Sequence, residues 1–221
     1  MMSLVTGIRS ALRQAADPTI AAGQQEYMKS AMPFLGVRVP AVRALVREGT
    51  RDAMDAPVLR DAALALWREA AFREERYAAL ALVALKPLRG DATLLPVHEE
   101  MIRTGAWWDL VDEAAHRLRE IFDVDHELMA VEMRVWADDD DLWVRRAAII
   151  SQLGRRGDTD LDVLEYAILA SIDDPEFFLR KAIGWALREY GKHDPDWVRT
   201  FVSQHPELSP LSRREALKNL G

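Results

Sequence analysis

The feature that most constrains the fold of this chain is a weak internal repeat of about 35 residues. The segment Trp143–Ile149 resembles Phe178–Gly184, which starts 35 positions later. Comparable positions carry alanines at spacings of 36, 33 and 35 residues, namely Ala78, Ala114, Ala147 and Ala182. Two helices and their turns need about this length, and a small residue lets the neighbouring helix approach closely. The repeat therefore predicts a stack of helical hairpins.

Local signals agree with an all-α fold. Ala, Leu, Arg and Glu are abundant, apolar residues recur every three to four positions, and no stretch alternates with the strand period. We expect about a dozen helices of roughly 9–16 residues with short connections. Capping residues followed by proline predict helix starts at Asp17-Pro18, Asp173–Glu176 and His193–Asp196. Because no Gly-, Ser- or Pro-rich linker divides the chain, we predict a single domain over residues 1–221.

Composition excludes several classes of function. The chain has no cysteine, which rules out disulfides, thiolate metal sites and thiol catalysis. No apolar run approaches the roughly 18 residues of a membrane span, and the first residues do not resemble a secretory signal. We therefore expect a soluble, intracellular protein without a membrane partner.

The net charge of −7 is distributed unevenly. Residues 1–90 carry +4, residues 91–142 carry −11, and residues 143–221 are neutral overall. An acidic protein is at first a poor candidate for binding nucleic acid. The uneven distribution still allows basic surfaces on both sides of the acidic segment.

Stacked repeats place equivalent positions in rows along one face. The register of the alanines puts Asp112, Arg145 and Arg180 in one row and Glu113, Arg146 and Lys181 in the next. Solenoids use such rows as extended concave binding surfaces. An acidic group among several cations favours an anionic polymer with a localised cationic feature as the ligand.

Two aromatic motifs are candidates for chemistry. Trp108 and Asp112 share a helix face at four-residue spacing, so an indole beside a carboxylate can stabilise a developing positive charge. A core tryptophan and an Asp–Arg ion pair explain the same pattern. Two further pairs share a helix face at three-residue spacing, Trp185 with Arg188 and Trp143 with Arg146. In such a pair the indole can stack on a sugar or base while the arginine binds a phosphate. A core indole beside a surface arginine explains the same spacing.

Signatures of metal and nucleotide sites are missing. The sequence has no Walker A motif and no G-x-G-x-x-G, and the five histidines lack metal-ligand spacing. The run Asp138–Asp141 is typical of a solvated loop that caps the next helix, with divalent-cation binding as the alternative.

Six segments together resemble the bacterial DNA alkylation repair glycosylases of the AlkD type. They follow the family order over nearly the whole chain and comprise Glu26–Lys29, Met32–Val37, Trp107–Asp112, Leu142–Ile149, Phe177–Tyr190 and Leu211–Ala216. The resemblance implies a right-handed all-α solenoid of HEAT-like repeats that holds duplex DNA on a basic concave face. It also implies hydrolysis of the N-glycosidic bond of N3- or N7-alkylated purines, such as 7-methylguanine and 3-methyladenine, without metal or cofactor.

The resemblance assigns roles to individual residues. Asp112 becomes the catalytic carboxylate, and Trp108 and Trp185 become the aromatic pair that flanks the deoxyribose of the lesion. The expected DNA-binding residues are Tyr27, Lys29, Arg38, Trp143, Arg146, Lys181 and Arg188. Arg38 departs from the family pattern, because a polar amide is expected at that position. We expect a monomer in the bacterial cytoplasm that associates with the nucleoid when bound to DNA.

A second interpretation is a non-catalytic helical-repeat scaffold that binds DNA or protein. The acidic segment 91–142 favours this scaffold. Asp112 together with Trp108 and Trp185 favours the enzyme, because a scaffold has no need of that constellation. A third interpretation is a relative adapted to branched or otherwise unusual DNA.

Overall fold

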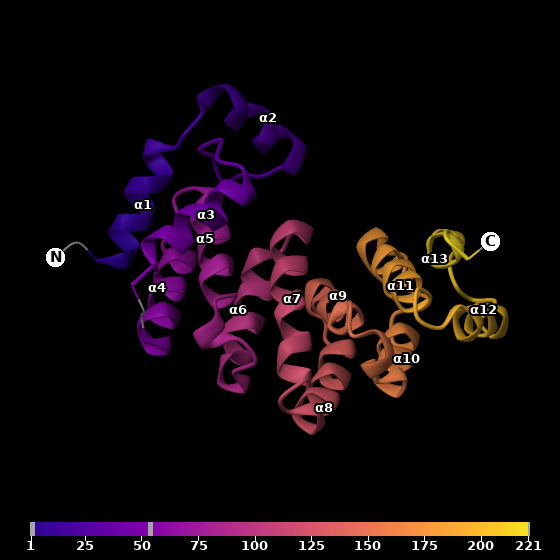
Figure 1. Cartoon of the computed structure of the whole chain (residues 1–221). Coiled ribbons are helices and arrows are strands. Elements are labelled where there is room, and N and C mark those ends of the chain that lie inside the picture. Colours follow the sequence, from indigo (N-terminus) through magenta and orange to yellow (C-terminus); the bar gives the residue numbers. More distant parts are fainter. Residues whose placement is uncertain (1–2, 53–54, 221) are drawn as a thin grey trace. The chain divides into compact units, whose positions relative to one another are not determined.

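The computed structural model describes residues 3–52 and 55–220. This part of the chain forms thirteen α-helices and three short 3₁₀ helices and contains no strand (Figure 1). The α-helices are 8 to 15 residues long. The prediction of an all-α chain with about a dozen helices is confirmed.

The chain divides into two compact units, Met1–Arg89 and Gly90–Gly221. We call them unit 1 and unit 2 and describe each by itself. That residues 1–221 act as one domain stays a prediction.

Unit 1 is built on the contacts of α1 with α3, of α3 with α5, and of α4 with α5. Its core contains the buried side chains of Leu12, Val42, Leu66 and Trp67. The helices of unit 1 are α1 (Leu4–Gln14), α2 (Pro18–Met28), α3 (Val39–Gly49), α4 (Ala56–Arg68), α5 (Arg73–Val83) and the 3₁₀ helix η1 (Lys86–Leu88).

A buried carboxylate holds the connection between α2 and α3. Glu74 is fully buried and accepts hydrogen bonds from the backbone N–H groups of Leu35, Gly36 and Val37 at 2.9, 2.9 and 3.1 Å. Gly36 has φ +89°, and a Cβ there would lie 2.0 Å from the carbonyl oxygen of Asp17. Only glycine therefore fits this close approach to the start of α2.

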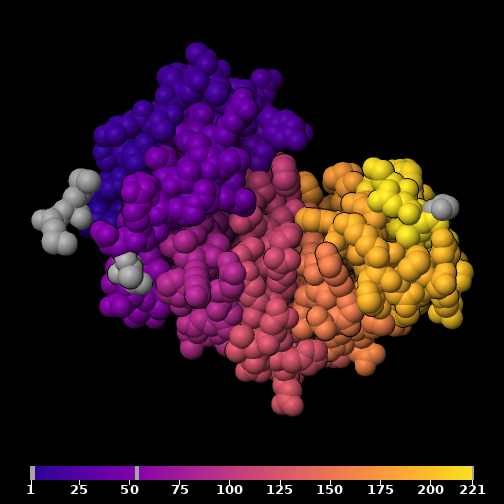
Figure 2. All heavy atoms as spheres, in the orientation of Figure 1, coloured from indigo at the N-terminus to yellow at the C-terminus, as the bar shows by residue number. Residues whose placement is uncertain are grey.

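Unit 2 packs its helices in succession. α6 packs on α7, α8 on α9 and α12 on α13, while α7, α9, α11 and α13 form a continuous row, each in contact with the next. In the space-filling view the atoms of this unit form one continuous body (Figure 2). The helices are η2 (Ala92–Leu94), α6 (Leu95–Gly105), α7 (Trp108–Phe122), α8 (His126–Ala137), α9 (Leu142–Ile150), η3 (Arg156–Asp158), α10 (Leu161–Leu169), α11 (Phe177–Tyr190), α12 (Pro195–Gln204) and α13 (Pro210–Leu217).

The alanines of the repeat occupy the positions that close helix packing requires. Ala114, Ala147 and Ala182 lie on α7, α9 and α11 and are fully buried. Ala78 has the same burial on α5 in unit 1. Small side chains at these positions allow neighbouring helices to approach, as the repeat predicts.

Two of the three predicted helix starts are confirmed. The carboxylate of Asp17 caps α2 and that of Asp194 caps α12, each with proline at the start of the helix. At the third, a helix does begin, since Glu176 of Asp173–Glu176 is the N-cap of α11, but the predicted capping aspartate and first-turn proline are wrong because both precede the helix. Asp174 instead accepts from the backbone N–H of Glu176 and pairs with Arg145 of α9.

None of the helices in residues 3–52 and 55–220 combines the length and the apolar character that a membrane crossing requires.

Candidate functional site

The carboxylate of Asp112 lies in a doubly bonded ion pair. Arg146 on α9 donates from Nε to Oδ1 and from Nη2 to Oδ2, both at 2.8 Å. The side chains of Arg146 and Asp112 are 6% and 16% exposed, so the arginine is buried and the carboxylate reaches the surface. A carboxylate has about four lone-pair positions, and two of them remain available to water or to a developing cation.

A third hydrogen bond holds the guanidinium of Arg146 in place. Its Nη1 donates to the backbone carbonyl of Phe178 on α11 at 2.6 Å. Three helices in succession, α7, α9 and α11, therefore determine where Asp112 points. The repeat register placed Asp112 in a row with Arg145, but its partner is Arg146 of the next row, and Arg145 pairs with Asp174.

An aromatic cluster of the buried Trp143 and the half-buried Trp107 and Phe178 surrounds the carbonyl that Arg146 uses. The ring centroids of Trp143 and Phe178 are 4.9 Å apart, and Trp107 lies 5.5 Å from Phe178 and 6.1 Å from Trp143. Trp143 is 8% exposed, so the structure places this predicted DNA-binding residue in the core. Any effect of Trp143 on DNA is then exerted through the packing of α9 against α11.

The two candidate tryptophans are half-buried on different helices. Trp108 is the first residue of α7, one turn before Asp112, and Trp185 lies on α11. The ring of Trp185 lies 6.2 Å from that of His116, which is one turn after Asp112. Nδ1 of His116 donates to the carbonyl oxygen of Asp112 at 3.0 Å, because a carbonyl can only accept. His116 thus links Trp185 to the helix turn of Asp112.

Both predicted cations of α11 are paired. Lys181 and Arg188 form ion pairs with the same acid, Glu215 on α13. Arg188 also donates to the backbone carbonyl of Glu215 at 3.3 Å. The structure therefore places these two candidate DNA contacts at the junction of α11 and α13.

Three candidate residues belong to unit 1. Tyr27 is 75% exposed at the end of α2, and Lys29 follows α2 in the left-handed conformation with φ 49°. Arg38 is exposed in the N-cap position of α3, directly after the segment that Glu74 holds. All three side chains are available to a ligand of unit 1.

The aspartate run before α9 acts as a cap, as the sequence predicts. Asp141 accepts from the backbone N–H of Trp143 at 2.8 Å. Asp139 accepts from the N–H of Asp141 at 2.8 Å and binds Arg103, and the hydroxyl of Tyr166 donates to Asp138 at 2.6 Å. Within the described residues no group of three or more acidic or histidine side chains is placed to hold a metal ion.

Sequence reasoning missed two residues of this region. His116 follows Asp112 at the same four-residue spacing that singled out Trp108, so its position on the site's face was readable. Glu215 lies in the segment Leu211–Ala216, which carries part of the family resemblance, but no role was assigned to it. Its contacts reach 27 and 34 positions along the chain, and spacing alone does not indicate them.

Comparison with solved structures places the fold among known proteins. A structure titled "Predicted DNA alkylation repair enzyme from Enterococcus faecalis" is 27% identical and has a TM-score of 0.84, with 93% of this chain and 97% of that chain covered. AlkD2 from Streptococcus mutans has a TM-score of 0.63 at 15% identity, with 90% and 98% covered. The protein smu.31 from Streptococcus mutans UA159 has a TM-score of 0.64 at 16% identity, with 95% and 100% covered. The last two likenesses concern the fold alone.

The match to a family covers almost the whole chain. No curated protein matched the sequence. The family described as "DNA alkylation repair enzyme" matches residues 8–220, which include Asp112, Arg146 and both candidate tryptophans. The chain belongs to the DNA alkylation repair enzyme family.

Proposed function

We propose that this protein is a monofunctional DNA glycosylase that removes N3- or N7-alkylated purines, such as 7-methylguanine and 3-methyladenine, from duplex DNA. The observation that supports this most is the carboxylate of Asp112, whose two oxygens accept hydrogen bonds from a buried arginine and whose side chain is 16% exposed. Family membership supports a role in the repair of alkylated DNA. We further propose that the protein acts as a monomer on chromosomal DNA in the cytoplasm.

The chemistry follows from the charge of the lesion. Alkylation at N3 or N7 gives the purine a positive charge, so the base leaves with the electron pair of the C1′–N bond and becomes neutral. The sugar is left as an oxocarbenium-like cation. Asp112 stabilises that cation and accepts a hydrogen bond from the attacking water, whose oxygen bonds to C1′ and whose proton passes to solvent.

The neighbours of Asp112 have separate tasks in this proposal. Arg146 is a positioning residue, because three of its five N–H groups are donated to Asp112 and to the carbonyl of Phe178. Contact of Arg146 with the DNA backbone, which the family resemblance implies, requires the guanidinium to use its free N–H groups or to leave Asp112. The indole faces of Trp108 and Trp185 attract positive charge by about 1 kcal/mol each.

The sharpest test replaces the carboxylate. Asp112→Asn keeps the size of the side chain but removes the charge that meets the oxocarbenium ion. The rate of excision should fall at least about 10²-fold, as for the loss of one electrostatic group in a preorganised site. The measurement is single-turnover release of 7-methylguanine from a duplex with one lesion, read as strand cleavage at the abasic site.

The matched control is Asp123→Asn, which removes one charge at the other end of the same helix, where the carboxylate is 62% exposed. This control should excise at the wild-type rate. Equal rates for Asp112→Asn and the wild type would remove Asp112 from the mechanism. A wild-type protein that binds the duplex but releases no base would favour the non-catalytic scaffold.

A further inference from the structure

The contact between α11 and α13 is unusually close because of one glycine. Lys181, Gly184 and Arg188 follow each other at i, i+3 and i+7, so they lie on one face of α11. A Cβ at Gly184 would lie 2.5 Å from Cβ of Glu215 and 2.9 Å from the carbonyl oxygen of Ser212. The missing side chain therefore allows α13 to bring Glu215 between the two cations.

One carboxylate then serves both cations. Nζ of Lys181 lies 3.2 Å from Oε1 of Glu215, and Nη1 of Arg188 pairs with Oε2. The hydrogen bond from Arg188 comes first among the causes that hold the pKa of Glu215 below its usual value. The three side chains form a cluster that we call the α11–α13 clamp.

The clamp lies at the edge of the solvent. The side chains of Lys181, Arg188 and Glu215 are 38%, 22% and 15% exposed, so a ligand in solution can reach the cations. A phosphate group offers the two cations the same charge-assisted hydrogen bonds as the carboxylate, so it can compete with Glu215 for them from the exposed side of Lys181. Glu215 accepts from the N–H groups of Lys181 and Arg188 that a phosphate would need.

We propose that Glu215 limits the affinity of the protein for DNA by competing with phosphates for Lys181 and Arg188. This inference rests on the proposed function, since it assumes that DNA is the ligand. Neutralised phosphates supply most of the affinity for DNA of any sequence. By holding that contribution down, Glu215 shortens the time that the protein spends on intact DNA and on its abasic product.

Glu215→Gln tests the proposal, because it keeps the shape of the side chain and removes the charge that holds the two cations. Affinity for an intact fluorescent duplex at about 0.1 M salt should rise roughly three- to tenfold, and the slope of log K against log[salt] should steepen by about one. Excision of 7-methylguanine should proceed at the wild-type rate under single turnover. Under multiple turnover it should slow by a similar factor, because the product leaves later.

The control is Asp196→Asn, which makes the same change of charge on α12. Asp196 is 90% exposed and pairs with Arg199 at 2.7 Å, so this variant also releases one cation within unit 2. It should leave both affinity and turnover unchanged. A difference in DNA affinity between the two variants then depends on where the charge is removed, because the net charge of the two variants is the same.

The outcomes separate this inference from the proposed function. If the wild type excises the lesion and Glu215→Gln binds intact DNA as the wild type does, the inference is wrong and the function stands. If Glu215→Gln tightens binding and neither protein excises, the inference stands without the glycosylase. Should Glu215→Gln not fold, Glu215→Asp retains the charge but is too short to serve both cations. A smaller rise in affinity is then expected, and no rise overturns the proposal.

Discussion

At the scale of single residues, the carboxylate of Asp112 depends on a buried arginine for its orientation. Removing Arg146 would leave the carboxylate without the two hydrogen bonds that fix its orientation. Breaking a largely buried ion pair is costly because the remaining charge is uncompensated. Arg146 therefore contributes to both the stability of α7 against α9 and the direction in which Asp112 points.

His98 gives unit 2 a defined dependence of stability on pH. It is buried in α6, and burial, followed by the charge of Arg117, lowers its pKa from 6.5 to about 4. Below pH 6.5 the unfolded chain binds a proton that the folded protein excludes. The free energy of unfolding should therefore fall as the pH drops from about 6.5 towards 4, by up to about 1.4 kcal/mol per pH unit.

Urea unfolding at pH 7, 6 and 5 measures this dependence, with His98→Leu as the comparison. Leucine does not titrate, so its unfolding free energy should change less over this range than that of the wild type. Parallel curves for the two proteins would show that His98 is protonated equally in the folded and unfolded states.

At the scale of helices, replacing glycine by alanine should have opposite effects on stability at two positions. Gly184→Ala should destabilise the protein by about 1–3 kcal/mol, because its Cβ would overlap Glu215 and Ser212 of α13. Gly23 lies in α2 with nothing within 4 Å of an added Cβ. Gly23→Ala should therefore stabilise the protein by about 0.4–1 kcal/mol through helix propensity. Chemical unfolding of both variants decides whether the α11–α13 contact is as close as described.

Helix starts show which local signals were sufficient. Asp17-Pro18 and Asp194-Pro195 cap their helices, and each carboxylate accepts from a backbone N–H of the first turn. Asp174-Pro175 carries the same signal, but its carboxylate binds Arg145 of α9 and the helix begins at Phe177. Asp174 still accepts from the backbone N–H two residues on, as Asp17 does, so the local signal forms its turn here while the helix starts just after it.

The same distinction applies to the candidate site. The shared face of Trp108 and Asp112 follows from four-residue spacing along one helix, and it was predictable. The partner of Asp112 was not, because Arg146 lies 34 positions away and depends on how α9 turns against α7. The partner of Asp112 is Arg146 and not Arg145 of the expected row. A repeat of about 35 residues therefore predicts which helices stack, but not which side chain of the neighbouring helix makes the contact.

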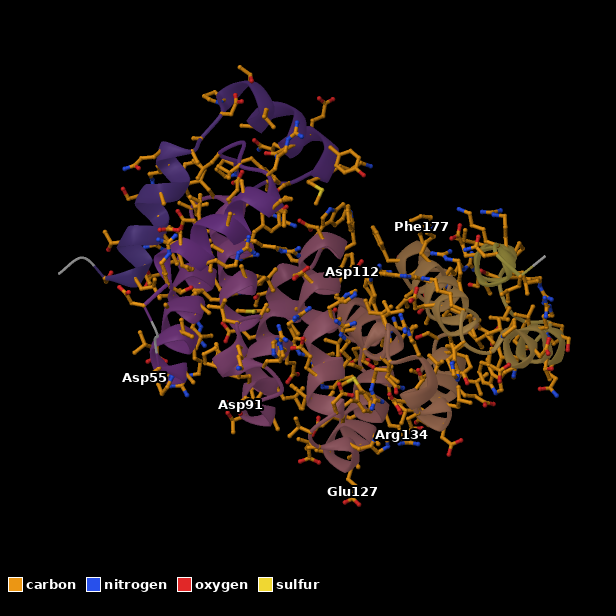
Figure 3. All side chains as sticks on the ribbon, in the orientation of Figure 1. Asp55, Asp91, Asp112, Glu127, Arg134 and Phe177 are labelled. Atoms are coloured by element: carbon orange, nitrogen blue, oxygen red, sulfur yellow. The ribbon has the colours of Figure 1, made fainter. Side chains whose placement is uncertain are left out.

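At the scale of the molecule, the acidic segment 91–142 has to be reconciled with an anionic ligand. Within unit 2, Asp112 and the exposed Phe177 lie towards the upper side of the view, whereas Asp91 and Glu127 lie on the lower side (Figure 3). Several other acids of the segment are engaged with arginines, such as Asp139 with Arg103 and Asp123 with Arg155. Part of the charge of −11 is therefore compensated by arginines outside the segment, Arg146 at Asp112 and Arg155 at Asp123, and part of it lies on the side away from Asp112.

A last prediction follows from this division of charge. Glu127→Gln combined with Asp91→Asn removes the charge of two acids of the segment that lie on the side of unit 2 away from Asp112 (Figure 3). Charges farther from the ligand than a Debye length of about 8 Å are screened at physiological salt. The affinity for a lesion-containing duplex should therefore change less than about twofold, measured by fluorescence anisotropy at about 0.15 M salt. A tenfold rise would place these acids beside the DNA, and it would favour the scaffold interpretation, in which the acidic segment forms part of the binding surface.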